Sequence, residues 1–243
     1  MSEELAVVAG ATGALGSAIV ERLQARGLRV VAVARRPPDM PGVVPVAADL
    51  ADDSAVDAIA GALDGPVRAV VQAAGLPGAG DVDTLTGVQV AAGFDTKVGG
   101  FLRLIRAAAP HLGPGSRLIV LGGHYGYEPS PAAPMAGMVN AALNNLVRSL
   151  ADRWGPDGVT VHVVAPGPVE SPRMEAIAAR TAERRGDVTP DEVLDGYRRA
   201  SPLGRLTTVD EVAWAVGMLL DDEAAALHGS VLSLDAGRRR GAG

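Results

Sequence analysis

The stretch from Leu5 to Gly16 constrains the fold of this chain more than any other. It opens with the run LAVVA, which lacks polar alternation and therefore predicts a strand buried on both faces, as in a parallel sheet. Glycines follow at positions 10, 13 and 16, and the next residues have helical spacing. A strand, a glycine turn and a helix form the context in which a dinucleotide diphosphate binds to free N–H groups at a helix N-terminus. An ordinary tight turn is the alternative.

The rest of the chain alternates apolar runs with helical patterns, which predicts one α/β domain over residues 1–243. The expected fold is a Rossmann-type, doubly wound parallel sheet of about seven strands with helices on both faces. The runs that we interpret as strands are 5–9, 28–34, 43–48, 67–73, 116–121, 159–164 and 230–234. Helices are expected over 52–63, 84–111, 135–154 and 208–220, and a charged helical pair over 170–200 is expected to be a substrate lid.

Composition narrows the class of protein further. The net charge of −6 argues against nucleic-acid binding, and no apolar run reaches membrane-spanning length. The N-terminal residues lack the pattern of a signal peptide, and the absence of cysteine is compatible with the cytoplasm. No metal site is expected, because no His/Cys/Asp cluster has ligand spacing. The basic run Arg238 to Arg240 near the C-terminus is expected to be a solvated tail.

Lys97 is the only lysine among 22 basic residues. Either a coding bias toward arginine spared one position, or position 97 requires an amine. An ammonium group is a compact proton donor whose pKa shifts readily on burial, whereas arginine stays charged. Lys97 is therefore a candidate catalytic residue.

The second predicted strand ends in Arg35 and Arg36. NAD sites often carry an acid at this strand end to hold the ribose hydroxyls, and Ala34 is not acidic. A guanidinium here could pair with a 2′-phosphate, which favours NADP(H) over NAD(H) as the cofactor. Two surface arginines at the start of a Pro-Pro loop are the alternative.

These motifs together resemble the short-chain dehydrogenase/reductase family over nearly the whole chain. The resemblance rests on Gly10-Ala11-Thr12-Gly13-Ala14-Leu15-Gly16, Asp49-Leu50, Ala74-Gly75, Ala165-Pro166-Gly167-Pro168-Val169-Glu170-Ser171, Pro202-Leu203-Gly204-Arg205, Asp210-Glu211-Val212-Ala213 and Asp235-Ala236-Gly237. Two details depart from the family pattern. Ala14 stands where the middle glycine is usual, and Gln72-Ala73 replaces an asparagine pair.

The resemblance implies a cofactor site at the strand ends. Asp49 would meet the adenine, and the segment after Pro166-Gly167 would pass the nicotinamide. The cofactor-binding residues expected in this way, together with the two arginines, are Gly10, Thr12, Gly13, Ala14, Leu15, Gly16, Arg35, Arg36, Asp49, Leu50, Ala73, Ala74, Gly75, Pro166, Gly167, Val169 and Ser171.

The active-site positions depart further from the resembled family. That family presents a serine after the fifth strand, then a tyrosine, a lysine four residues later, and an asparagine on the preceding long helix. With the register set by Ser149-Leu150-Ala151, Gly123 falls at the serine position, Ala136 at the tyrosine, Asn140 at the lysine and Lys97 at the asparagine. Lys97 and Asn140 are thus exchanged. The chain resembles ketoreductase domains of polyketide synthases in that detail.

Neither Gly123 nor Ala136 can donate a proton, so a replacement acid is required for carbonyl reduction. His124 and Tyr125 follow the fifth predicted strand at its carboxyl end and are the candidate replacements, with Tyr127 close by. An imidazole titrates near neutral pH, and a phenol near an ammonium could have its pKa lowered. Packing under the Pro-rich bend that follows is the alternative.

Three functions remain open from the sequence. The first is an NADP(H)-dependent oxidoreductase that acts on a carbonyl or alcohol of a small molecule, using Lys97, Asn140 and His124 or a nearby tyrosine. The second is a non-redox isomerase, dehydratase or cyclase on the same scaffold, and the third is a catalytically silent nucleotide-binding protein. The first is favoured, because hydride transfer requires the retained cofactor motifs. The resemblance also implies a homodimer or homotetramer formed through the two long helices.

Overall fold

A seven-stranded parallel sheet forms the centre of the computed structural model, which describes residues 3–77 and 80–241. The strand order is β3-β2-β1-β4-β5-β6-β7, and every neighbouring pair is parallel. The strands are β1 (Leu5–Ala9), β2 (Arg29–Ala34), β3 (Val43–Ala47), β4 (Val67–Gln72), β5 (Arg117–Leu121), β6 (Thr160–Pro166) and β7 (Val231–Leu234). The predicted Rossmann-type sheet is confirmed. The expected domain over 1–243 includes residues 1–2, 78–79 and 242–243, which lie outside the described residues.

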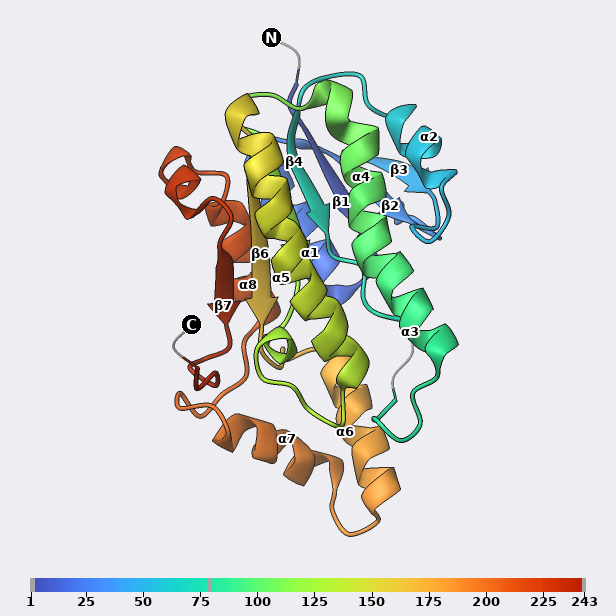
Figure 1. Ribbon diagram of the computed structural model, residues 1–243, viewed down its shortest axis with the longest axis vertical. Helices are drawn as coiled ribbons and strands as arrows, with labels where there is room; N and C mark the ends of the chain where they lie inside the picture. Colours follow the sequence, from blue (N-terminus) through green and yellow to red (C-terminus); the bar gives the residue numbers. More distant parts are fainter. Residues whose placement is uncertain (1–2, 78–79, 242–243) are drawn as a thin grey trace.

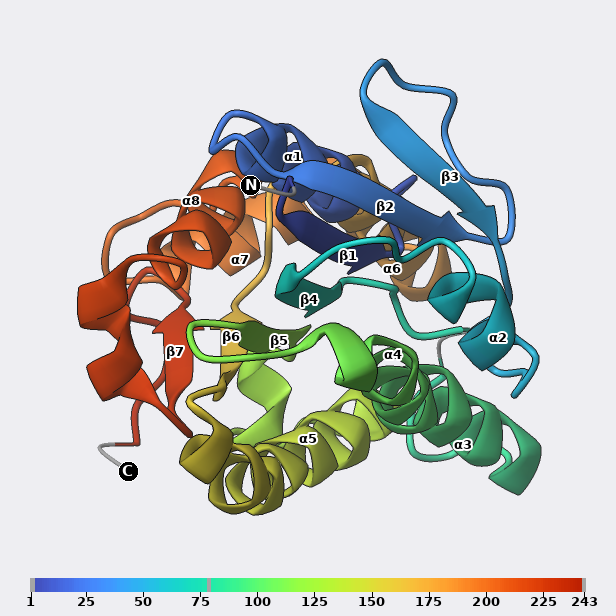
Figure 2. The same ribbon diagram turned by 90° about the horizontal axis from the view of Figure 1, so that it is seen from above.

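Helices cover both faces of this sheet, as Figure 2 shows in the view from above. The helices are α1 (Ala14–Gln24), α2 (Ala55–Ala60), α3 (Gly87–Phe94), α4 (Gly100–Ala108), α5 (Pro134–Trp154), α6 (Pro172–Arg185), α7 (Pro190–Arg199) and α8 (Val209–Met218). One core joins the sheet to α1 and α8 through residues such as Ile19 and Val216, and the other joins it to α4 and α5 through Phe101 and Leu143. Within the described residues, none of the helices combines the length and apolarity that crossing a bilayer would require.

The predicted helix over 84–111 is interrupted in the structure. Helix α3 begins at Gly87, three residues later than predicted. Thr86 precedes it and forms a capping box with Gln89. Between α3 and α4 the chain widens into a π-helical segment, Asp95–Gly99. Helical spacing alone does not reveal an i→i+5 turn, and such turns are frequent at functional sites. This one holds Lys97.

The carboxyl ends of the strands gather at one edge of the sheet, and the helical pair predicted over 170–200 lies beyond this edge. Figure 1 shows α6 and α7 past the arrowheads of β4 and β6. Helix α7 begins where the sequence predicts, with a capping box between Thr189 and Glu192. Strands β1 and β4 are neighbours at the point where the strand order reverses, which is where doubly wound sheets bind ligands.

Candidate active site

The glycine loop after β1 leaves a helix N-terminus bare. Gly10 has φ +77°, and a Cβ atom there would lie 2.5 Å from the amide nitrogen of Ala74. At Gly16 a Cβ atom would lie 2.0 Å from the carbonyl oxygen of Gly10, so only glycine lets α1 approach the loop this closely. Gly13 precedes α1 as the N-cap, no side chain caps it, and Thr12, Gly13 and Ala14 are exposed. This bare, positively polarised backbone fits a dinucleotide diphosphate.

The expected adenine-side residues lie at the ends of β2, β3 and β4. Arg35 and Arg36 follow β2 and are exposed, and neither forms an ion pair with another residue in 3–77 or 80–241. Asp49 is exposed, and its carboxylate accepts the N–H of Ala51 at 3.1 Å. Leu50 is instead buried, where it supports Gly100 of α4.

The other end of the expected site follows β6. A Cβ atom at Gly167 would lie 2.9 Å from the Cβ of Asp235, so the turn after Pro166 packs closely against the C-terminal segment. Val169 pairs with Thr207 in an isolated parallel bridge. The hydroxyl of Ser171 accepts the N–H of Met174 and caps α6. The connection between β6 and α6 therefore contains the expected residues Pro166, Gly167, Val169 and Ser171. Leu15 is half-buried in the first turn of α1.

Lys97 is buried at the carboxyl end of β5, with only 6% of its surface exposed. Its Nζ donates a hydrogen bond to the carbonyl oxygen of Leu121 at 2.5 Å. Burial, with a further contribution from the positive charge of Arg173, lowers the pKa of Lys97 from 10.5 to about 7. The amine can therefore gain or lose a proton near neutral pH.

Gln72 joins the end of β4 to the π-helical segment that carries Lys97. Its side-chain oxygen accepts the N–H of Ala74 at 2.8 Å, and its Nε2 donates to the carbonyl oxygen of Thr96 at 3.0 Å. Gln72 is fully buried, so these bonds form without competition from water. The departure from the family's asparagine pair thus has a structural role. It fixes Ala73, Ala74 and Gly75 relative to the segment next to Lys97.

Gly123 and Asn140, at the serine and lysine positions of the family pattern, lie against each other. A Cβ atom at Gly123 would lie 2.9 Å from Nδ2 of Asn140. Any side chain at position 123 would therefore require Asn140 to shift. Asn140 is buried on α5, and the 3₁₀ turn His124–Gly126 packs directly over it, because a Cβ atom at Gly126 would lie 2.9 Å from the Cβ of Asn140. Lys97 and Asn140 thus converge on the backbone that ends β5.

His124 and Tyr125 stack on each other beside this point, with ring centroids 4.0 Å apart. Burial, assisted by the charge of Arg238, lowers the pKa of His124, so the imidazole is neutral at pH 7. Burial and the neighbouring Tyr197 raise the pKa of Tyr125. The expectation of a phenol with a lowered pKa is therefore wrong for Tyr125, because the dominant effect on it is desolvation.

The arginine run near the C-terminus is not a solvated tail. The carboxylate of Asp235 accepts the N–H groups of Gly237 and Arg239, which turns the chain back toward the site. The three arginines then contact the loop after β5 and α7. Arg238 lies over the ring of Tyr197 at 5.3 Å, Arg239 lies over Tyr127 at 3.7 Å, and the N–H of Arg240 bonds to the carboxylate of Glu128.

Sequence reasoning missed Arg173, which lies in the first turn of α6. A Cβ atom at Gly75 would lie 2.6 Å from Nη1 of Arg173, so the guanidinium covers the end of β4. No local pattern announces this contact, because it depends on how α6 docks across the strand ends.

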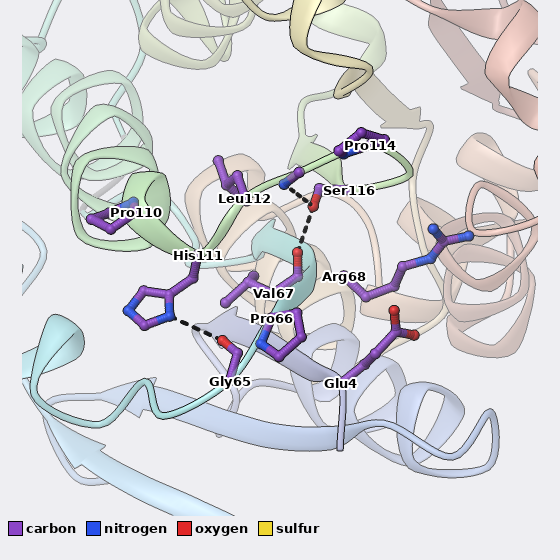
Figure 3. A pocket seen from close by; sticks show the side chains of 11 residues that line it. Glu4, Gly65, Pro66, Val67, Arg68, Pro110, His111, Leu112, Pro114 and Ser116 are labelled. Carbon is purple, nitrogen blue, oxygen red and sulfur yellow. Dashed lines mark hydrogen bonds between the residues drawn. The ribbon is translucent and has the colours of Figure 1, made fainter. Parts of the chain in front are cut away.

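A separate cavity of about 350 Å³ lies at the opposite edge of the sheet. Figure 3 shows it among residues that precede or begin β1, β4 and β5. Two polar side chains of the lining bond to carbonyl oxygens of the lining: His111 Nδ1 pairs with the carbonyl oxygen of Gly65 at 3.0 Å, and the Ser116 hydroxyl donates to the carbonyl oxygen of Val67 at 2.6 Å. The perturbed lysine and the bare helix N-terminus both lie at the other edge, so we assign no chemistry to this cavity.

The chain is similar in sequence and in structure to known proteins. The model of the enoyl-(acyl carrier protein) reductase family matches residues 10–239. The short-chain reductase protein NovJ of Streptomyces niveus is 29% identical, over 97% of this chain and 94% of its own. A short chain dehydrogenase family protein from Francisella tularensis has a TM-score of 0.89 at 20% identity, covering 98% and 99% of the two chains. A short chain dehydrogenase from Burkholderia cenocepacia, solved with NADP, has a TM-score of 0.80 at 26% identity and 96% coverage of both chains.

Proposed function

The chain belongs to the short-chain dehydrogenase/reductase family of oxidoreductases, and from this premise we propose that it transfers hydride between NADP(H) and a carbonyl or alcohol of a small molecule. One observation carries the proposal. Lys97 is a buried amine with a pKa of about 7 at the end of β5, on the same sheet edge as the bare N-terminus of α1. The NADP complex of the Burkholderia cenocepacia relative supports the choice of cofactor.

The described residues offer a contact for each part of such a cofactor. The N–H groups of the first turn of α1, from Ala14 on, suit the diphosphate, and Arg35 and Arg36 suit a 2′-phosphate. Asp49 is available to the adenine end, and the turn after Pro166 to the nicotinamide end. When bound, the cofactor supplies the hydride, and the protein supplies orientation and the proton.

We assign to Lys97 the role of the acid that donates this proton. Reduction of a carbonyl leaves an alkoxide, and an acid with a pKa near the working pH transfers a proton to it efficiently. The carbonyl oxygen of Leu121 holds Nζ in place at 2.5 Å, and within residues 3–77 and 80–241 Nζ makes no second hydrogen bond, which leaves N–H groups for a substrate oxygen. Asn140, on α5, brings an amide N–H donor close to Gly123, just after β5. His124 is neutral at pH 7 and Tyr125 has a raised pKa, so both serve better as pocket walls than as the acid.

A second candidate function is an isomerase or dehydratase on this scaffold. It is favoured by the close packing of Asn140 against Gly123, which occupies the space where the family carries its serine. In that case Lys97 would add or remove a proton at the carbon next to a carbonyl group, without net hydride transfer.

The experiment that separates the two functions measures NADPH consumption over a panel of small ketones, aldehydes and 2-oxo esters. Oxidation of NADPH with formation of the matching alcohol supports the oxidoreductase. Tight NADPH binding with no reduction of any panel member, together with exchange of substrate protons for deuterium in D₂O, supports the non-redox enzyme.

We also propose that the protein is a homodimer or homotetramer. Val88 on α3, Leu102 on α4 and Met138 on α5 are exposed, at 80%, 38% and 42% of their surfaces, on the helices that cover one face of the sheet. Apolar side chains grouped on one face mark association surfaces. We expect light scattering at micromolar concentration to give at least the dimer mass. Met138→Glu should shift the protein to monomer, whereas Leu203→Glu, at an exposed leucine elsewhere, should not. A monomeric parent protein would contradict the proposal.

A further inference from the structure

Arg173 extends from α6 over the end of β4. The residue is exposed, yet its guanidinium reaches Gly75, where a Cβ atom would lie 2.6 Å from Nη1. Gly75 follows Ala74, the residue whose backbone Gly10 abuts. The guanidinium therefore lies close to the point where the glycine loop meets the end of β4.

This guanidinium has no carboxylate partner in the part of the chain that the structure describes. The charged group that it does influence is Lys97, another cation. Two cations thus face the same strand ends, while most other arginines of the chain form ion pairs or bond to carbonyl oxygens. Such an uncompensated positive region favours an anion next to Arg173.

We propose that Arg173 binds the diphosphate of the dinucleotide, in addition to the N-terminus of α1. The inference rests on the proposed function, because it requires a dinucleotide in this crevice. A guanidinium forms paired, charge-assisted hydrogen bonds with phosphate oxygens, which the N–H groups around Gly13 do not duplicate. Because Arg173 is carried by α6, this contact would also fasten the helical pair α6–α7 over the bound cofactor.

The test compares Arg173→Gln with Arg180→Gln, which removes another exposed arginine of the same helix. Calorimetry measures the affinity for NADP⁺ and for adenosine 2′-monophosphate, which retains the adenine end and the 2′-phosphate but has neither phosphate of the diphosphate. We expect Arg173→Gln to weaken NADP⁺ binding about tenfold or more, as loss of a charge-assisted contact does. The affinity for adenosine 2′-monophosphate should change less than about twofold, and Arg180→Gln should affect neither ligand.

A second readout follows the helical pair directly. NADP⁺ should slow tryptic cleavage within residues 172–199 in the parent protein and in Arg180→Gln, but much less in Arg173→Gln at saturating NADP⁺.

Each result of the calorimetry has a different consequence for the proposal. An unchanged NADP⁺ affinity in Arg173→Gln overturns the assignment. If the variant then discriminates less between a 2-oxo acid and its methyl ester, the anion bound by Arg173 is a carboxylate of the substrate. Equal weakening of NADP⁺ and adenosine 2′-monophosphate also overturns it, because the effect is then not at the diphosphate. A parent protein that binds neither ligand overturns the proposed function itself, and this inference with it.

Discussion

Replacing Lys97 with methionine will lower the rate of carbonyl reduction by about 10²- to 10⁴-fold, the usual contribution of a positioned acid, and will also stabilise the fold. The amine is buried and its pKa falls from 10.5 to about 7, so at pH 7 the fold is destabilised by about 4 kcal/mol relative to an unperturbed lysine. Methionine removes that cost and loses one hydrogen bond to Leu121, worth about 1 kcal/mol. The net gain in the free energy of unfolding should be about 3 kcal/mol. Urea unfolding and NADPH-coupled rates measure the two effects.

The pH dependence of the stability difference identifies its cause. Protons bind Lys97 more weakly in the folded protein than in the unfolded chain, so its destabilising effect is complete below pH 7. That effect disappears as the pH rises from 7 toward 10.5. The gain of Lys97→Met over the parent protein should therefore shrink across this range. A gain that does not change with pH would show that packing, and not protonation, is responsible.

Replacing Gly16 with alanine will destabilise the protein by about 3 kcal/mol, because the added Cβ would lie 2.0 Å from the carbonyl oxygen of Gly10. The three atoms nearest to this Cβ belong to the backbone of Gly10 and Ala11. No side chain can move aside, so α1 must move away from the loop. The displaced N–H groups should then lower the affinity for NADPH by about 10²-fold. Thermal unfolding and fluorescence titration with NADPH measure the two losses.

Gly13→Ala is the matched control for this prediction. A Cβ atom at Gly13 meets only the carbonyl oxygen of Gly10, at 3.5 Å, which is an ordinary contact. The free energy of unfolding should therefore change by less than about 0.5 kcal/mol. Equal stability losses in the two variants would contradict the view that close approach at Gly16 shapes the loop.

The fold could be predicted because both faces of the sheet are buried. An apolar run without alternation, such as 5–9, indicates a parallel strand, and β1 has those bounds. Boundaries set by side-chain hydrogen bonds were harder to predict. The helix predicted over 52–63 is shorter in the structure, because the carboxylate of Asp52 accepts the N–H of Ser54 and forms a turn, and α2 spans only Ala55–Ala60.

The parts of the candidate site that could be predicted are those that a local sequence pattern reveals by itself. Lys97 stood out as a solitary lysine, and the glycine loop stood out by its spacing. Contacts between distant segments could not be predicted from local patterns. The reach of Arg173 to Gly75, the packing of Arg239 on Tyr127 and the burial that raises the pKa of Tyr125 all depend on how α6, α7 and the C-terminal segment dock.

The solitary lysine permits the most direct test of the central claim, that an amine with a pKa near 7 faces a dinucleotide at the strand ends. Protein labelled with ¹³C at the lysine side chain should give one ε-carbon signal, which needs no assignment because Lys97 is the only lysine. We predict that this signal titrates near pH 7 and shifts when NADP⁺ is added. A signal that titrates near 10.5 and does not respond to NADP⁺ would contradict the account.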